Sequence, residues 1–173
     1  MDAAGLRTRL QQAQAALLAN GPRIAEIYGA GVLALVRLRI QRDGLIGRVY
    51  SSREVPRFFF YNKALNAAGR SYAKKGGKGT WAAFRAAQGL PADAVYLTYT
   101  GGMFRALLVR ADGTAQAGVF EASLLAADQE SANKVKWNTA RFGNFLRPLP
   151  SEERLAAQSA ADEVNRILNQ YLQ

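Results

Sequence analysis

Cysteine and histidine are both missing from the 173 residues of this chain. Without cysteine, the chain can form neither a disulfide framework nor a thiol site, and assembly in a reducing cytosol is the plain interpretation. Without histidine, it lacks the commonest general base and the commonest ligand of transition metals. The two absences exclude catalytic devices of the Ser-His and Cys-His kinds.

Long apolar runs are missing as well. The sequence contains no stretch of about 18 apolar residues that would span a membrane. The first ten residues lack the apolar core of a secretory signal. With 49% apolar and 21% charged residues, the composition is that of a globular protein. We therefore expect a single domain over residues 1–173 and no membrane partner.

Acidic residues are scarce in one part of the chain, and the whole net charge of +10 is concentrated there. Between Arg37 and Arg85, twelve lysines and arginines accompany only two acids, Asp43 and Glu54, whereas the charges outside this window cancel. Two interpretations stay open: a polyanionic partner, DNA above all, or a solubilising loop. The candidate DNA-facing residues are Arg37, Arg39, Arg42, Lys74, Lys75 and Lys78.

The first 43 residues carry helical patterns and predict an N-terminal pair of helices. An apolar stripe at helical spacing predicts a helix over 5–19, with Asn20-Gly21 as its stop signal. Pro22 is suited to the first turn of a second helix over 22–42, which Asp43-Gly44 would end. The stripe consists of Leu6, Leu10, Ala13 and Leu17.

Residues 44–80 form a basic, aromatic region that we expect to be irregular apart from a short helix over 64–73. Its aromatic run, Phe58 to Tyr61, is too apolar to leave in water as one patch. The run is either a strand or arm buried in the core or in a neighbouring subunit, or a base-stacking platform flanked by Arg57 and Lys63. The glycine-rich segment 74–79 is not a phosphate-binding P-loop, because Gly79 separates Lys78 from Thr80.

Residues 81–173 predict an α+β core and a C-terminal helix. Thr80 is suited to cap a helix over 81–88, and loose alternation predicts a strand over 94–100. Strands over 105–110 and 116–124, joined by a tight turn at 111–114, predict an antiparallel hairpin at about 105–124. A helix over 127–142 should end at Gly143, and Ser151 should cap the last helix. The fold class is thus α+β, with helices packed on a small antiparallel sheet.

Carboxylate pairs offer no catalytic arrangement. The two pairs, Glu152-Glu153 and Asp162-Glu163, lie on the predicted C-terminal helix, where neighbouring side chains point about 100° apart and do not converge on one substrate. In the basic window only Asp43 and Glu54 are available, too few for a carboxylate metal site. We expect a protein that is not an enzyme and binds no cofactor.

The link between the last two helices, residues 143–150, should be extended, because Pro148 and Pro150 remove two backbone donors. Such a segment suits a sheet edge or a groove on a neighbour. We expect Phe142, Phe145 and Leu146 to pack on the hairpin and Arg147 to lie near a subunit boundary. The candidate subunit-interface residues are Phe58, Phe59, Phe60, Tyr61, Phe145, Leu146 and Arg147.

Residues 97–105 resemble the T-G-x-L/M element that opens the core of phage virion-morphogenesis and tail-completion proteins. In that family two strands follow, then a segment ending in Phe-Gly, an Arg-Pro-Phe-Leu-like link and a terminal helix. The same order is seen here in Thr100 to Met103, the hairpin, the segment that ends at Gly143, Phe145 to Pro148, and a helix from Ser151. The C-terminal part looks like that of the Mu-type members, and the resemblance covers about residues 97–173.

The resemblance implies a structural protein of the phage neck or tail end. Such proteins have small α+β folds and act as rings, commonly six-fold, that cap or complete the tail tube and join it to the head-side connector. The implied partners are other copies of the chain, tail-tube and connector proteins, and the DNA that passes through the ring. The implied location is the virion, after assembly in the host cytoplasm. A nucleic-acid-binding module that uses the basic window at 37–85 is the alternative.

Overall fold

The structure is a computed structural model that describes residues 3–62, 65–97, 101–114 and 118–172. The fold is α+β, as predicted, with long helices and two small antiparallel sheets of two strands each. The chain divides into two compact units: unit 1 comprises Met1–Leu38 and Tyr99–Gln173, and unit 2 comprises Arg39–Thr98. The expectation of a single domain stays a prediction, and each unit is described by itself.

The N-terminal region is one helix, α1, from Ala3 to Asp43, so the predicted pair of helices with a break at Asn20-Gly21 is wrong. Pro22 lies inside the helix, where it removes one backbone hydrogen bond. The Asn20 side chain donates to the carbonyl of Ala16 at 2.8 Å, on the preceding turn. Gly21 is buried, because the ring of Phe120 occupies the space that a Cβ would take. Tertiary packing on this face therefore outweighs the local stop signal.

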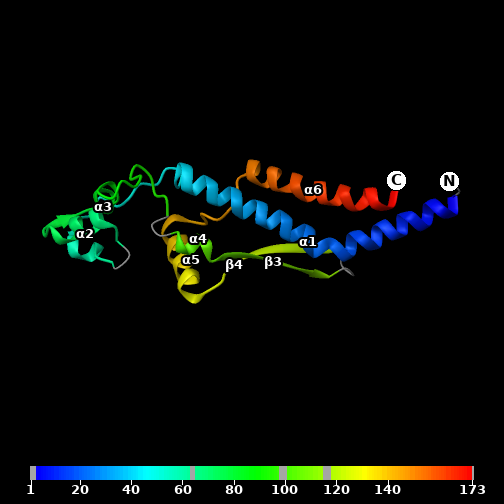
Figure 1. Cartoon of the computed structure of the whole chain (residues 1–173), viewed down its shortest axis with the longest axis horizontal. Helices are drawn as coiled ribbons and strands as arrows, with labels where there is room; N and C mark the ends of the chain where they lie inside the picture. The colour runs from blue at the N-terminus through cyan, green and yellow to red at the C-terminus, as the bar shows by residue number, and fades with distance from the viewer. Residues whose placement is uncertain (1–2, 63–64, 98–100, 115–117, 173) are drawn as a thin grey trace. The chain divides into compact units, whose positions relative to one another are not determined.

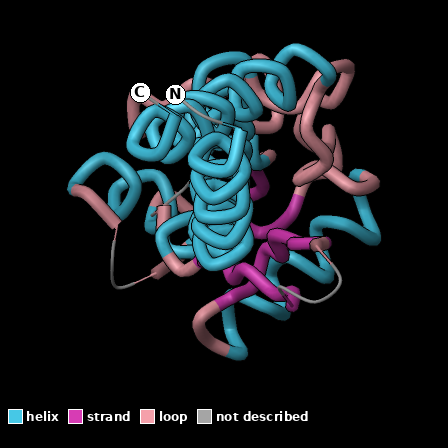
Figure 2. The backbone as a smooth tube through the Cα atoms, turned by 90° about the vertical axis from the view of Figure 1, so that its right-hand side faces the viewer, coloured by secondary structure: helices cyan, strands magenta, loops and turns pink. Residues whose placement is uncertain are grey.

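In unit 1, α1 packs against the C-terminal helix α6 (Pro150–Leu172) and against the hairpin, through glycines that let the backbones approach closely. A Cβ on Gly29 would lie 2.6 Å from Cγ1 of Val109, and one on Gly31 would lie 3.2 Å from Cβ of Ala156. Arg23 of α1 also pairs with Glu163 of α6 at 3.2 Å. Figures 1 and 2 show α1 between α6 on one side and the hairpin on the other.

The hairpin consists of β3 (Leu107–Thr114) and β4 (Val119–Ala126) in antiparallel register. The predicted turn at 111–114 is wrong, because Asp112 pairs with Glu121 and Gly113 pairs with Phe120, so the strands continue through it. The alternation that places Val109, Phe120 and Ala122 toward α1 requires this register. The segment before β3 is a short helix, α4 (Gly102–Arg105), where a strand was expected from Arg105.

Helix α5 (Gln129–Phe142) ends at Gly143, with φ +84°, as predicted, and begins at an Asp128 cap whose carboxylate accepts from the Ser131 N–H at 2.7 Å. The link after it is not extended throughout, because the Arg147 N–H donates to the Asn144 carbonyl and forms a turn. Helix α6 starts at Pro150 rather than after a Ser151 cap.

Unit 2 contains more regular structure than the irregular region predicted over 44–80. Strands β1 (Val55–Pro56) and β2 (Lys78–Gly79) pair, and between them lie the 3₁₀ helix η1 (Arg57–Phe60) and the helix α2 (Ala67–Lys74). Helix α3 (Trp81–Ala86) follows the predicted Thr80 cap, whose hydroxyl accepts from the Ala83 N–H at 3.2 Å. The strand expected over 94–100 is reduced to a bridge between Val95 and Leu45, and residues 98–100 lie outside the described ranges.

Candidate interaction surfaces

Acidic side chains in the described ranges form no group of three or more that could hold a metal ion. Asp43 is paired with Arg42 at 2.7 Å, and the hydrogen bond from Arg42 holds the pKa of the Asp43 carboxyl below its usual range. Glu163 is similarly occupied: Arg166 donates to it at 2.7 Å and lowers its pKa, with Arg23 on its other side. The absence of catalysis stays a prediction. No helix in the described part of the chain is long and apolar enough to cross a membrane.

In the carboxylate pair Glu152-Glu153, Glu152 caps the start of helix α6. The carboxylate of Glu152, which is buried, accepts from the backbone N–H of Leu149 at 2.7 Å. The Glu153 N–H donates to the Leu149 carbonyl, so Leu149 is the residue that precedes the first turn. Glu152 thus supplies the start signal that the sequence pattern assigned to Ser151.

The aromatic run 58–61 is divided between the interior and the surface. Phe60 is 3% exposed, whereas Phe58, Phe59 and Tyr61 are 65%, 66% and 54% exposed. Burial in the core is thus confirmed for one ring, which lies in a 3₁₀ helix, and base stacking by the exposed rings stays a prediction. Because its own chain already covers Phe60, we remove this residue from the candidate subunit interface.

Phe60 is the centre of an aromatic cluster in unit 2. Its ring stacks on that of Phe84, with the ring centroids 4.7 Å apart. It also contacts Trp81 and Tyr72 edge-on, at centroid separations of 5.2 Å and 6.0 Å. Tyr72 in turn lies under the guanidinium of Arg57 at 4.7 Å. Aromatic pairs of this kind stabilise beyond their burial. The cluster therefore anchors η1, from which the exposed rings project.

The candidate DNA-facing residues fall into two groups. Lys74, Lys75 and Lys78 are exposed and lie on either side of the Gly76-Gly77 turn of unit 2. Arg39 and Arg42 belong to the end of α1 in unit 2, and Arg42 is paired with Asp43. Arg37 belongs to unit 1 and is half-buried, and its buried Nε has no hydrogen-bond partner among the described residues.

The candidate interface residues in the link between α5 and α6 are divided between the core and the surface. Phe145 is 6% exposed and belongs to the core, Leu146 is half-buried, and Arg147 is exposed. We remove Phe145 from the candidate interface for the same reason as Phe60. The expected packing of Phe142, Phe145 and Leu146 on the hairpin stays a prediction.

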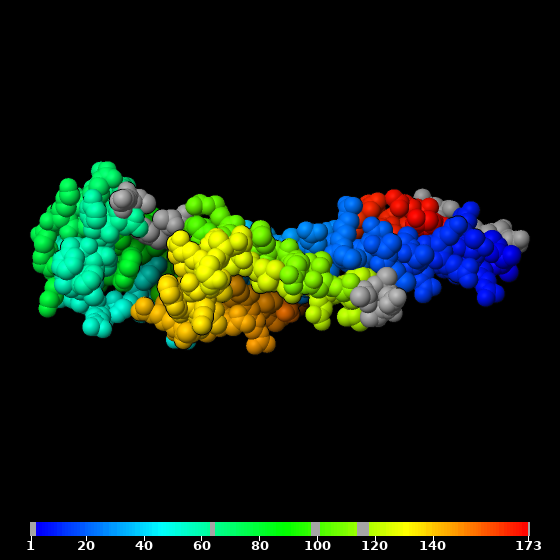
Figure 3. All heavy atoms as spheres, turned by 90° about the horizontal axis from the view of Figure 1, so that it is seen from below, coloured from blue at the N-terminus to red at the C-terminus, as the bar shows by residue number. Residues whose placement is uncertain are grey.

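The outer face of the hairpin carries exposed apolar side chains at its two ends, which sequence reasoning missed, and the polar residues Arg110, Asp112 and Glu121 lie between them. Leu108 of β3 lies directly opposite Leu125 of β4, and the two are 52% and 38% exposed. Val119, at the start of β4, is 59% exposed. Figure 3 views the hairpin from the side opposite α1, where its green and yellow-green strands lie open. The available signal was the lack of strict alternation in the pairs Leu107-Leu108 and Leu124-Leu125, because apolar residues at successive positions of a strand point to opposite faces.

Unit 1 also has an apolar groove of about 810 Å³ between α1, β4 and α6. Its walls include Leu17 and Ile24 of α1, Phe120 of β4, and Ala160 and Val164 of α6. The groove holds no group of reactive side chains, and Glu121 is its one acidic neighbour among the described residues.

Comparisons of this chain with protein families, with curated proteins and with solved structures find no match. The functional argument therefore depends on the sequence and structure of this chain, and the resemblance to phage virion-morphogenesis proteins stays a prediction.

Proposed function

We propose that the protein is a structural subunit that assembles with copies of itself into a ring at the phage neck or tail end. There it completes or caps the tail tube and joins it to the head-side connector. The observation that carries self-assembly is the β3–β4 hairpin, which has one face on α1 and, on its outer face, the exposed apolar side chains of Leu108, Leu125 and Val119.

The hairpin is unusual for a protein that stays a monomer. A sheet of two strands is marginal without further packing, and its long outer edges are templates for pairing with another chain. In the described ranges, β3 and β4 pair only with each other, so each has one edge without a strand partner. The opposed pair Leu108 and Leu125 adds apolar area to this surface. A neighbouring subunit that covered one strand edge and this pair would satisfy the unpaired backbone groups and bury the exposed leucines.

The placement at the phage neck is supported by the resemblance of residues 97–173, which includes this hairpin. The chemistry of the chain agrees with a structural role, because cysteine and histidine are missing. The proposed partners are other copies of the chain in a six-fold ring, the tail-tube and connector proteins, and the DNA in the channel. The proposed location is the virion, after assembly in the host cytoplasm.

The hairpin surface is tested by replacing Leu108 and Leu125 together with glutamine and measuring mass in solution by light scattering. Both side chains are exposed, so the variant should fold, with an unchanged far-UV spectrum. It should fail to form the rings that we expect electron microscopy to show for the unchanged protein. The matched control is Leu155→Gln, on α6, which is 55% exposed and should leave rings intact. Rings that persist in the double variant would contradict the assigned surface.

The phage role is tested separately with particles that lack the protein. Unjoined heads and tails are the expected result, and joined, normal virions would contradict it.

A further inference from the structure

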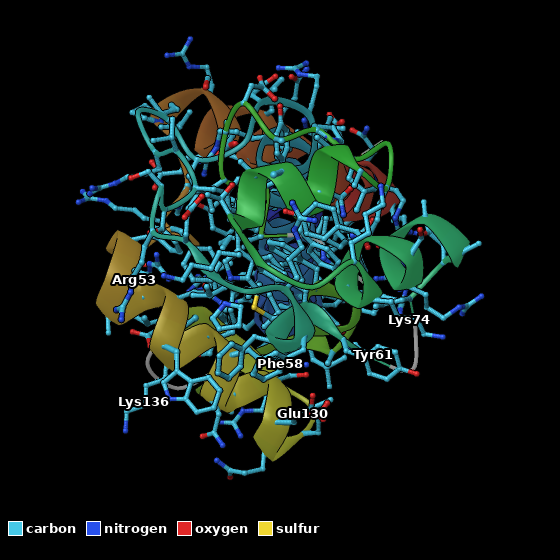
Figure 4. All side chains as sticks on the ribbon, turned by 90° about the vertical axis from the view of Figure 1, so that its left-hand side faces the viewer. Arg53, Phe58, Tyr61, Lys74, Glu130 and Lys136 are labelled. Atoms are coloured by element: carbon cyan, nitrogen blue, oxygen red, sulfur yellow. The ribbon has the colours of Figure 1, made fainter. Side chains whose placement is uncertain are left out.

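We propose that unit 2 carries a binding site for single-stranded nucleic acid, in which one nucleotide unit occupies a cavity between η1 and the end of α2. The cavity has a volume of about 450 Å³, within the range of sites that hold small ligands. Phe58 and Tyr61 line one side, and Lys74, Gly76 and Gly77 line the other. Figure 4 labels Phe58, Tyr61 and Lys74, with Tyr61 and Lys74 near one another.

The aromatic wall is exposed and held in place. Phe58 stacks on Phe59 with ring centroids 4.6 Å apart, and both rings are about two-thirds exposed. The backbone below them is held by hydrogen bonds from the Arg57 N–H to Gly77 and from the Tyr61 N–H to Phe58. The buried ring of Phe60 anchors the same turn. Rings that are fixed before binding lose little conformational freedom when a base stacks on them.

The opposite wall suits a phosphate. Lys74 lines the cavity, and the exposed Lys75 and Lys78 follow it along the chain. Lys75 is in the right-handed helical conformation, and Gly76 and Gly77 follow with φ of +67° and +69°. Backbone of this kind turns successive N–H groups toward one side, an arrangement that binds anions. The Lys75 N–H already donates to the Tyr72 carbonyl at 3.4 Å, so the N–H groups of Gly76 and Gly77 are the ones proposed to face the phosphate. A side chain at either glycine would meet no atom within 4 Å, so glycine is required there by conformation and not by space.

The charge of the whole unit favours a strand over a free nucleotide. Unit 2 has eleven lysines and arginines against three acids, a net charge of +8, although it has only about a third of the chain. A positive surface larger than the cavity can neutralise several successive phosphates, and Phe59 offers a second ring for a neighbouring base. A duplex keeps the faces of its bases inside the stack, so its bases cannot stack on these rings.

The test measures the binding of a labelled oligothymidylate of about 12 nucleotides by fluorescence anisotropy over a range of salt concentrations. Phe58→Ala should weaken binding about tenfold with little change in the salt dependence, because it removes a stacking surface and no charge. Lys74→Ala should lower the slope of log K against log salt by about 0.7, the value for one phosphate contact on a single strand.

Matched controls come from α5 of unit 1. Trp137 is 67% exposed and Lys136 is exposed, so Trp137→Ala and Lys136→Ala remove a comparable ring and a comparable charge that do not line the cavity. Both should leave the affinity nearly unchanged. Because Phe58 is exposed, its variant should keep the melting temperature of the unchanged protein.

Competitors identify the ligand. The unlabelled single strand should displace the probe, whereas thymidine monophosphate, the matching duplex and vesicles with anionic headgroups should do so only at far higher concentrations. Equal competition by duplex or vesicles would overturn the site in favour of general electrostatic attraction, and equal competition by the mononucleotide would overturn the assignment to a strand. A Phe58→Ala variant that binds as the unchanged protein would overturn the cavity itself.

Discussion

The ring of Phe120 in β4 occupies the space where a Cβ on Gly21 of α1 would lie. This contact joins the middle of the longest helix to the hairpin, and it lies one residue before a proline that the helix continues through. It explains why the sequence Asn20-Gly21-Pro22 is helical here, although its residues are typical of a helix end.

Replacing Gly21 by alanine should therefore destabilise unit 1 in spite of the better helix propensity of alanine. We expect a loss of roughly 1–3 kcal/mol in the free energy of unfolding, measured with denaturant, because the added methyl group overlaps the ring. In a Phe120→Ala background the same change should be neutral or stabilising by up to about 1 kcal/mol, since the space is then empty. Additive effects in this double-mutant cycle would contradict the contact.

Pro22→Ala should stabilise the protein. A proline inside a helix costs about 3 kcal/mol relative to alanine, so the gain should be about 1–3 kcal/mol in denaturant unfolding. Pro150→Ala is the control, because Pro150 begins α6, where proline is well tolerated, and its replacement should change little. If α1 were broken after Asn20, the two substitutions would have equal, small effects.

Stability should depend on pH through Glu163. Hydrogen bonding from Arg166 lowers the pKa of this carboxyl in the folded state, so its contribution is present above the unfolded pKa, about 4.3, and is lost as the pH falls through the folded pKa. Glu163→Gln should lower the melting temperature near neutral pH, and the difference from the unchanged protein should vanish in acid.

The neighbouring substitution Asp162→Asn provides the control for this measurement. Asp162 is exposed, and the same charge removed there should produce a much smaller change across the pH range. Equal effects at the two positions would assign the pH dependence to the overall charge of the protein.

The start of α6 should be sensitive to Glu152 and insensitive to Ser151. Glu152→Ala removes the acceptor of the Leu149 N–H and should cost about 1 kcal/mol in the free energy of unfolding. Ser151→Ala should be nearly neutral, because its exposed hydroxyl lies inside the first turn. The opposite order of effects would restore Ser151 as the cap.

Phe60→Ala should destabilise unit 2 strongly, by about 3–5 kcal/mol, because it removes the centre of the aromatic cluster. Phe59→Ala, on the next residue, should change stability by less than about 0.5 kcal/mol, because that ring is exposed. Amide hydrogen exchange in residues 65–97 distinguishes the two variants: protection should fall only in the first.

Two of the signals that act within one turn of chain gave correct predictions. The cap at Thr80 and the stop at Gly143 are of this kind, because each depends on a residue and its own backbone a few positions away. The start of α6 was misplaced by about one residue for a related reason: Ser151 and Glu152 both suit a helix start, and only the burial of Glu152 chooses between them.

Register and burial could not be predicted in the same way. Asp112-Gly113 is a strong turn signal, yet both residues pair within the hairpin, since the strand faces that pack on α1 decide the alignment. In the aromatic run, four neighbouring rings have similar propensities, and the contacts of Phe84 and Trp81 select Phe60 alone for the core.

By itself the sequence determined which residue types are missing, where the positive charge lies along the chain, where α3 begins and where α5 ends. These properties belong to single residues or to a few neighbours, so no fold is needed to read them. Only the tertiary structure decided that α1 is continuous, which face of the hairpin is open, and that Phe58 and Tyr61 share a cavity with Lys74. Each of these depends on contacts between segments far apart in the chain, whose packing energy exceeds the local preferences of about 1 kcal/mol per residue.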